Sequence, residues 1–180
     1  MKVASSLILA VSSLLVRDRG VSGPAQIADA PAHVQNVFQF TIAAPLKVVA
    51  PLFGPNGERC WAGRHWDPEF LYPQPGNDIE GAVFTVQHDG HKSVWVNTRF
   101  DPGEGVMQYV SFIPDALVST IDVKLTPMDS STTGVEVTYR RTALSSAANE
   151  DVVAMGKSDS QSGPKWQSGI ESCLKAQSVH

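Results

Sequence analysis

The stretch "FTIAAPLKVVAPLFGPNGERCWAGRHWDPEF", residues 40–70, changes its hydrophobic period partway along. Its start continues an alternating run from residue 34, which predicts a strand with one apolar face. That face holds Val34, Phe38, Phe40 and Ile42. The spacing of Leu46, Val49 and Leu52 then predicts a short helix with Pro45 in its first turn. We expect residues 54–57 to end it in a turn and "GERCWAG" to form one more short helix.

Downstream, alternating runs replace the helical spacing. "GAVFTVQH" (81–88) and "HKSVWVNTRF" (91–100) flank Asp89-Gly90, the preferred chemistry of a two-residue hairpin turn. Residues 105–113, 117–128 and 135–142 alternate in the same way. No segment of helical length separates these runs, so we expect an antiparallel meander of five or six strands. The pattern does not decide which face of the 82–100 hairpin points inward, because both faces are half apolar.

The C-terminal part returns to a helical period. "SSAANEDVVAMG" is expected to begin a helix behind serine caps, and "GKSDSQSGP" to break or kink it. "PKWQSGIESCLKAQ" resumes it, with Trp166, Ile170, Cys173 and Leu174 on one face. This order of elements predicts an α+β domain in which a single sheet wraps around one amphipathic helix, leaving room for a cavity.

Composition limits the classes of partner. The chain has 180 residues, 42% of them hydrophobic, which is enough for one domain with a core. The formal net charge is −4 and Lys and Arg form no runs. A nucleic-acid or anionic-membrane surface would need a clustered basic face. We therefore expect no nucleic-acid partner, and the oligomeric state stays open.

The two cysteines and the N-terminus bear on location. Cys60 and Cys173 are too few for a disulfide framework, so two free thiols are the default expectation, with a single bridge if the chain is exported. Lys2 precedes an apolar run that suits a signal peptide and is too short to span a bilayer, but "RDRG" follows where small neutral residues are preferred. We treat residues 1–32 as an extension or signal peptide and residues 33–178 as the domain. A cytoplasmic location is favoured, with export as the alternative.

Four stretches resemble the START/Bet v 1-like helix-grip superfamily (SRPBCC; polyketide cyclase/dehydrase and lipid transport family). They are residues 40–70, "VWVNTRFDPGEGVMQYVSFIP" (94–114), "GVEVTYRRTALS" (134–145) and the terminal helix with Trp166. The resemblance implies a curved antiparallel sheet around a long C-terminal helix, two short helices after the first strand, and an apolar cavity. Members bind lipids, sterols or polyketides; a few are enzymes and some are co-chaperones. The loop-like "GKSDSQSG" departs from the continuous helix of the family.

The resemblance and the inward positions together suggest the residues that bind a ligand. They are Phe38, Phe40, Trp61, Trp66, Phe84, Trp95, Tyr109, Ile121, Val123, Val137, Tyr139, Trp166 and Ile170. We expect non-catalytic binding of a small hydrophobic molecule without a cofactor, and no integral membrane segment in the domain. A cyclase/dehydrase-like enzyme is the first alternative and an Hsp90-activator-like interaction module the second.

Residues 57–70 also concentrate reactive side chains. The spacing of Cys60, His65 and Asp67 matches no common zinc arrangement, and no strained nucleophile turn accompanies them. We therefore interpret the segment as a structural elbow or pocket rim rather than a metal or catalytic site. Glu58 and Arg59 are expected to cap, pair or face solvent.

Other polar candidates lie in the strands. His88 and His91 should face each other across the hairpin, which is too few ligands for a strong metal site. Arg141 shares the face of Tyr139 and could reach the cavity mouth, while Tyr109 and Tyr139 could donate hydrogen bonds to a ligand. No phosphate loop, dinucleotide-binding or nucleophile-elbow motif occurs.

Overall fold

The computed structural model of the chain describes residues 30–88 and 90–178. The expected signal-peptide segment and residue 89 of the hairpin turn lie outside the described residues. The strands are β1 (His33–Ile42), β2 (Glu69–Tyr72), β3 (Val83–His88), β4 (His91–Asp101), β5 (Val106–Ile113), β6 (Leu117–Pro127) and β7 (Thr133–Ala143). The helices are α1 (Leu46–Val49), η1 (Ala50–Phe53), α2 (Pro55–Glu58), η2 (Ser146–Ala148), α3 (Asn149–Asp159) and α4 (Gly163–Gln177).

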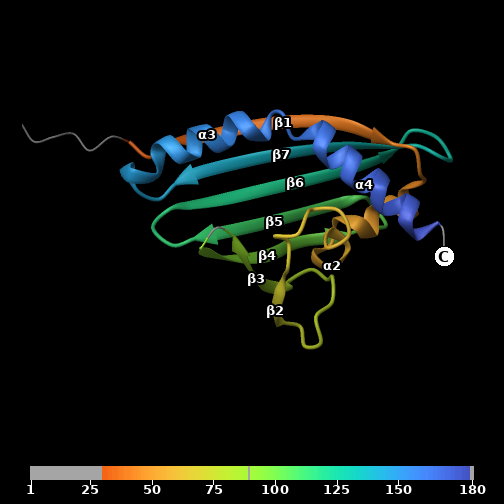
Figure 1. Cartoon of the computed structure of the whole chain (residues 1–180), viewed down its shortest axis with the longest axis horizontal. Helices are drawn as coiled ribbons and strands as arrows, with labels where there is room; N and C mark the ends of the chain where they lie inside the picture. The colour runs from red at the N-terminus through yellow and green to blue at the C-terminus, as the bar shows by residue number, and fades with distance from the viewer. Residues whose placement is uncertain (1–29, 89, 179–180) are drawn as a thin grey trace, which may run out of the picture.

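All seven strands form one curved antiparallel sheet in the order β1-β7-β6-β5-β4-β3-β2. Each strand from β2 to β7 pairs with the next, and β1 joins the edge beside β7 (Figure 1). Helix α3 runs beside β1 and β7, and α4 crosses the sheet at an angle (Figure 1). The predicted α+β fold, with a sheet around a C-terminal helix and short helices after the first strand, is confirmed.

The inner face of the sheet carries the core. Along β1 the side chains alternate, and Phe38, Phe40 and Ile42 are buried while their neighbours are exposed. They pack with Val137 of β7 and Ile170 of α4 in one cluster. Burying such side chains contributes roughly 1.5–3 kcal/mol each, so this contact holds α4 on the sheet.

The elbow between β1 and the meander differs from the expected pattern in one place. Residues 54–57 were expected to form a turn, but α2 begins at Pro55. The reason is the first-turn position, where the fixed backbone angle of proline suits a helix and its missing N–H costs nothing. Asp78 accepts hydrogen bonds from the backbone N–H groups of Asn56 and Gly57, at 3.0 and 3.4 Å, and so satisfies two free donors of this helix.

The hairpin of β3 and β4 has a single inward face over most of its length. Phe84 pairs with Trp95 and is fully buried, and Asn97 is buried on the same face. The register then shifts between Asn97 and Arg99. Beyond this bulge Phe100 packs on the core and pairs with buried Met107. The inserted residue changes the side of the strand that faces the core, which explains why both faces read as half apolar.

The C-terminal helical segment is interrupted as predicted. Helix α3 ends at Asp159 and α4 begins at Gly163, so three residues separate them. The expected serine caps are wrong: the residue before α3 is Ala148, and no side chain caps this end. The side chain of Asn149 instead accepts a 2.7 Å hydrogen bond from the backbone N–H of Ala32, because the start of the domain lies beside it.

Candidate functional site

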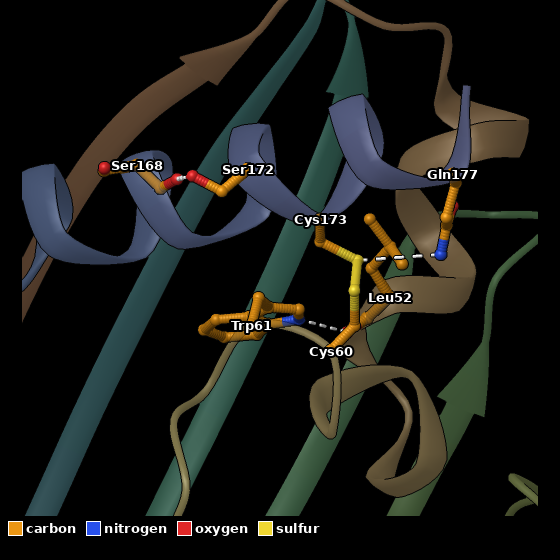
Figure 2. The surroundings of a disulfide bond; sticks show 7 residues. All are labelled: Leu52, Cys60, Trp61, Ser168, Ser172, Cys173 and Gln177. Carbon is orange, nitrogen blue, oxygen red and sulfur yellow. Dashed lines mark hydrogen bonds between the residues drawn. A yellow bond between two sulfur atoms is a disulfide. The ribbon is translucent and has the colours of Figure 1, made fainter. Parts of the chain in front are cut away.

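A disulfide bond joins the elbow to the last helix. Cys60 and Cys173 are bridged, with their Cα atoms 5.6 Å apart, so the expectation of two free thiols is wrong and the alternative of one bridge is correct. Figure 2 shows the bridge between α4 and the loop below it, with Trp61 beside it. The indole N–H of Trp61 donates a 2.7 Å hydrogen bond to the carbonyl of Leu52. The bridge and this bond fix the position of Trp61.

Glycine lets α4 approach the elbow closely. A Cβ atom at position 169 would lie 2.9 Å from the backbone oxygen of Trp61, which is closer than real Cβ contacts. At position 57 a Cβ atom would overlap the carbonyl oxygen of Pro51. Both glycines are therefore needed for the packing of backbone against backbone around the bridge.

Reducing the bridge should destabilise the domain. Because 113 residues separate the two cysteines, loop-closure entropy predicts a loss of about 4–5 kcal/mol in the free energy of unfolding. Urea denaturation with and without dithiothreitol measures this loss. The variant Cys60→Ser/Cys173→Ser is the control, since it should match the reduced wild type and not respond to dithiothreitol. Equal midpoints for the oxidised and reduced wild type would contradict the prediction.

Between the elbow, the sheet and α4 lies a cavity of about 170 Å³, here called the inner chamber. It is lined by Glu58, Trp61, Ala62, Trp66, Trp95, Tyr109, Ile121, Tyr139, Lys165 and Trp166. The set includes all four tryptophans of the chain and two of its three tyrosines. The chamber is therefore an aromatic site, with one carboxyl and one ammonium group on its wall.

Most polar atoms of these aromatic residues are already bound to the protein. The indole N–H of Trp66 donates to the carbonyl of Pro55 at 2.9 Å, and that of Trp95 to Oγ of Ser93 at 2.8 Å. The hydroxyl of Tyr109 donates to the carbonyl of Phe53. In contrast, the hydroxyl of Tyr139 has no hydrogen-bond partner among the described residues. Burial raises the pKa of Tyr139, so its hydroxyl stays protonated and can donate to a ligand.

Glu58 departs from the expectation that it would cap, pair or face solvent. It is only 9% exposed, and its carboxyl has no hydrogen bond or ion pair within residues 30–88 and 90–178. Burial raises its pKa well above the ordinary value, and the nearby charge of Asp78 raises it further. Because a buried, unpaired carboxylate is costly, this group favours either a proton or a positively charged partner.

A larger cleft of about 660 Å³, here called the outer cleft, adjoins the inner chamber. The two spaces share Ala62, Trp66, Trp95, Tyr139 and Lys165 on their walls. The outer cleft extends between the sheet and α3, whose residues Asp151, Met155 and Ser158 line it. The two spaces are therefore neighbours that share one aromatic wall.

Arg141 lies on the wall of the outer cleft, but its guanidinium already forms an ion pair with Asp159. Its guanidinium donates to both oxygens of Asp159 at 2.6 and 2.8 Å, and to Oγ of Ser119 at 2.9 Å. It also stacks 4.5 Å from the centre of the Tyr139 ring. The pair anchors the end of α3 on β7 where the helix breaks, and leaves little of the guanidinium for a ligand carboxylate.

Several solved structures share the fold of this chain at low sequence identity. Norcoclaurine synthase from Thalictrum flavum, solved in complex with dopamine and hydroxybenzaldehyde, has a TM-score of 0.59 at 10% identity, over 96% of this chain and 98% of that one. Ara h 8.0201 has a TM-score of 0.59 at 16% identity, over 80% and 99%. Both are Bet v 1-like proteins. The chain has the Bet v 1-like helix-grip fold. No protein-family model matches the sequence, and no curated protein matches it.

Two bacterial proteins show the same likeness. XoxI from Bacillus cereus has a TM-score of 0.57 at 15% identity, over 79% of this chain and 94% of that one. An uncharacterised protein from Rhizobium leguminosarum has a TM-score of 0.57 at 15% identity, over 82% and 97%. At these identities the likeness concerns the helix-grip fold alone.

The structure brings seven of the thirteen sequence-predicted binding residues onto the wall of the helix-grip cavity. These are Trp61, Trp66, Trp95, Tyr109, Ile121, Tyr139 and Trp166. The others are buried and do not line the chamber, although the rings of Phe38 and Phe84 pack behind its wall: Phe38, Phe40, Phe84, Val123, Val137 and Ile170. Their role in binding stays a prediction. Sequence reasoning missed Glu58, Ala62 and Lys165. Glu58 and Ala62 lie in and just after a helix too short to show an inward face, and Lys165 is an exposed charged residue of α4.

Cys60, His65 and Asp67, the reactive side chains of the elbow, do not form one site in the structure. Cys60 is in the disulfide, so it is neither a thiolate ligand nor a nucleophile in the oxidised protein. Asp67 pairs with Arg59, while His65 and His91 lie on the wall of the outer cleft. Among the described residues no three His, Cys, Asp or Glu side chains come together as a metal site. No helix of the described part is long and apolar enough to cross a membrane.

The raised pKa of Glu58 predicts a pH dependence of stability. Below the ordinary value of about 4.3 the folded and unfolded chains both hold the proton. As the pH rises, the unfolded chain ionises first, so stability falls until the pH passes the raised pKa of the folded state. Urea denaturation of the wild type and of Glu58→Gln between pH 4 and 9 measures this loss.

The glutamine variant cannot ionise at position 58, so its stability should fall less over this range. Some slope remains in both proteins, because burial also raises the pKa of Asp78. Parallel curves for the two proteins would show that the folded carboxyl of Glu58 titrates normally.

Proposed function

We propose that the protein binds a small, largely apolar molecule in the inner chamber. The observation that carries this proposal is the gathering of all four tryptophans around one cavity that adjoins the outer cleft. Pockets lined by aromatic side chains with few polar groups are typical of small-molecule sites. The Bet v 1-like fold agrees with this function without fixing the ligand.

A larger side chain at the wall that the two spaces share tests this proposal. The neutral dye N-phenyl-1-naphthylamine, which brightens in apolar sites, should bind the wild type. Ala62 lies on both walls, so Ala62→Phe should weaken dye binding by about tenfold or more through loss of space. Ala147→Phe is the matched control, because Ala147 is exposed and lines neither space. Equal dye affinity of the two variants would show that the dye binds elsewhere.

An enzyme is the second candidate, favoured by one observation. Glu58 is a buried carboxyl without a partner in the described structure, and its pKa is raised, which suits a group that donates a proton to a bound carbonyl compound. Nothing in the described structure favours the third candidate, an interaction module of the co-chaperone type.

Turnover can be tested with whatever compound is extracted from the purified protein. If the enzyme candidate is correct, mass spectrometry should detect a product with the wild type, and Glu58→Gln should form it at least about a hundredfold more slowly. An exposed substitution, Glu150→Gln on α3, controls for expression and handling. Recovery of the unchanged compound from the wild type would favour binding alone.

The disulfide bears on the location of the protein. Cytosolic reductants keep thiols reduced, and disulfides persist in oxidising compartments. The Cys60–Cys173 bridge therefore supports export rather than the cytoplasmic location favoured by the sequence. Thiol labelling of fractionated cells measures this, and a reduced pair in the cytosol would contradict it.

A further inference from the structure

The aromatic rings around the inner chamber form walls rather than a stack. Trp66 and Trp95 have ring centroids 5.2 Å apart and planes at 85°, and Tyr139 meets Trp166 at 81°. Trp61 and Trp166 are 5.0 Å apart with planes at 58°. The first two pairs are edge-to-face contacts and the third is tilted, so the rings support one another at fixed angles. The chamber beside them is therefore bounded by a rigid aromatic wall.

The faces of these rings carry negative electrostatic potential. Three of the four indole N–H groups, the positive edges of the rings, are bonded to protein oxygen atoms of Leu52, Pro55 and Ser93. These N–H groups are therefore satisfied by the protein, and the tryptophans contribute mainly ring carbon to the chamber wall. Such a surface attracts a cation within about 6 Å of a ring centre and repels the oxygen of a carbonyl group.

The carboxyl of Glu58 lies on the wall of the same chamber without a partner in the described structure. The neighbouring carboxyl of Asp78 is different, because the backbone N–H groups of Asn56 and Gly57 already satisfy it. Arg59 pairs with Asp67 and also donates to the carbonyl of Pro68, so its charge is not directed at Glu58. A neutral apolar ligand would leave Glu58 desolvated and unpaired, whereas a cation would stabilise its carboxylate.

One positive group, Lys165, also lies on the wall. It is exposed and is shared with the outer cleft, so it lies where water screens its charge. Tyr109 and Tyr139, the other titratable groups of the wall, are neutral because burial raises the pKa of both. The balance of the wall therefore favours a positive group beside Glu58 and an electron-rich part of the ligand toward Lys165.

We propose that the inner chamber binds an organic cation, with an ammonium nitrogen between the tryptophan rings and Glu58 and a small apolar body around it. The proposal rests on the small-molecule function above and specifies its ligand class. It requires no chemistry beyond binding.

A pair of probes with the same shape and different charge tests the proposal. Choline and 3,3-dimethyl-1-butanol differ by a positive nitrogen in place of a carbon atom. Calorimetric titration of the oxidised full-length protein at pH 8 and low salt should give at least about tenfold tighter binding of choline. Glu58→Gln should remove most of this preference by weakening choline and not the alcohol. Glu150→Gln, the exposed control, should keep the wild-type ratio.

A second measurement does not depend on a substitution at Glu58. Fluorinated tryptophan at all four positions weakens the negative potential of the rings with little change in shape. Choline affinity should fall severalfold, while the affinity of the alcohol stays the same. If choline binds no tighter than the alcohol to the wild type, or if its preference survives both changes, the cation proposal is wrong.

The outcomes separate this proposal from the function on which it rests. Binding of N-phenyl-1-naphthylamine that is lost in Ala62→Phe, together with no choline preference, would overturn the cation and leave the small-molecule site. Failure of the dye and of both probes to bind the wild type would overturn both.

Discussion

The covalent link between Cys60 and Cys173 is the constraint on which the candidate site depends. The segment between β1 and β2, which includes the elbow, contains helices of only four residues each, and such short helices have no stability of their own. The bridge and the close contact at Gly169 hold the elbow against a long helix that the core already fixes on the sheet. Glu58 and Trp61 of the elbow thereby lie on the same chamber wall as Trp166 of α4, with the ring of Trp61 packed against that of Trp166.

The polar groups around this space divide into those bonded within the fold and those without a partner among the described residues. Arg141 is bound by Asp159 and Ser119, and the hydroxyl of Tyr109 by the carbonyl of Phe53. These bonds satisfy groups whose burial would otherwise destabilise the domain. Glu58 and the hydroxyl of Tyr139 have no such partner in the described residues. The inner chamber thus has a largely apolar wall on which the carboxyl of Glu58 and the hydroxyl of Tyr139 stay unbonded within the described structure.

The sequence predicted the fold well because alternation is regular along most of β6 and the central parts of β1 and β7, and the sheet has one buried face. It failed on β4, where one inserted residue near Arg99 exchanges the two faces without any signal in composition. Seven aromatic and aliphatic residues of the chamber wall were found because large apolar side chains point inward by default. Glu58 was missed because the same rule places an isolated carboxylate in water.

The break between α3 and α4 determines how the two helices lie over the two spaces. A continuous helix over residues 149–177 would run straight along the sheet, but the loop at residues 160–162 redirects the chain, and α3 keeps a separate position beside β1 and β7. The bidentate pair of Asp159 and Arg141 fixes that position at the break. The outer cleft lies along α3, and the inner chamber lies under α4. Interruption of the helix therefore leaves the outer cleft along α3 and the aromatic inner chamber under α4 as two adjoining spaces.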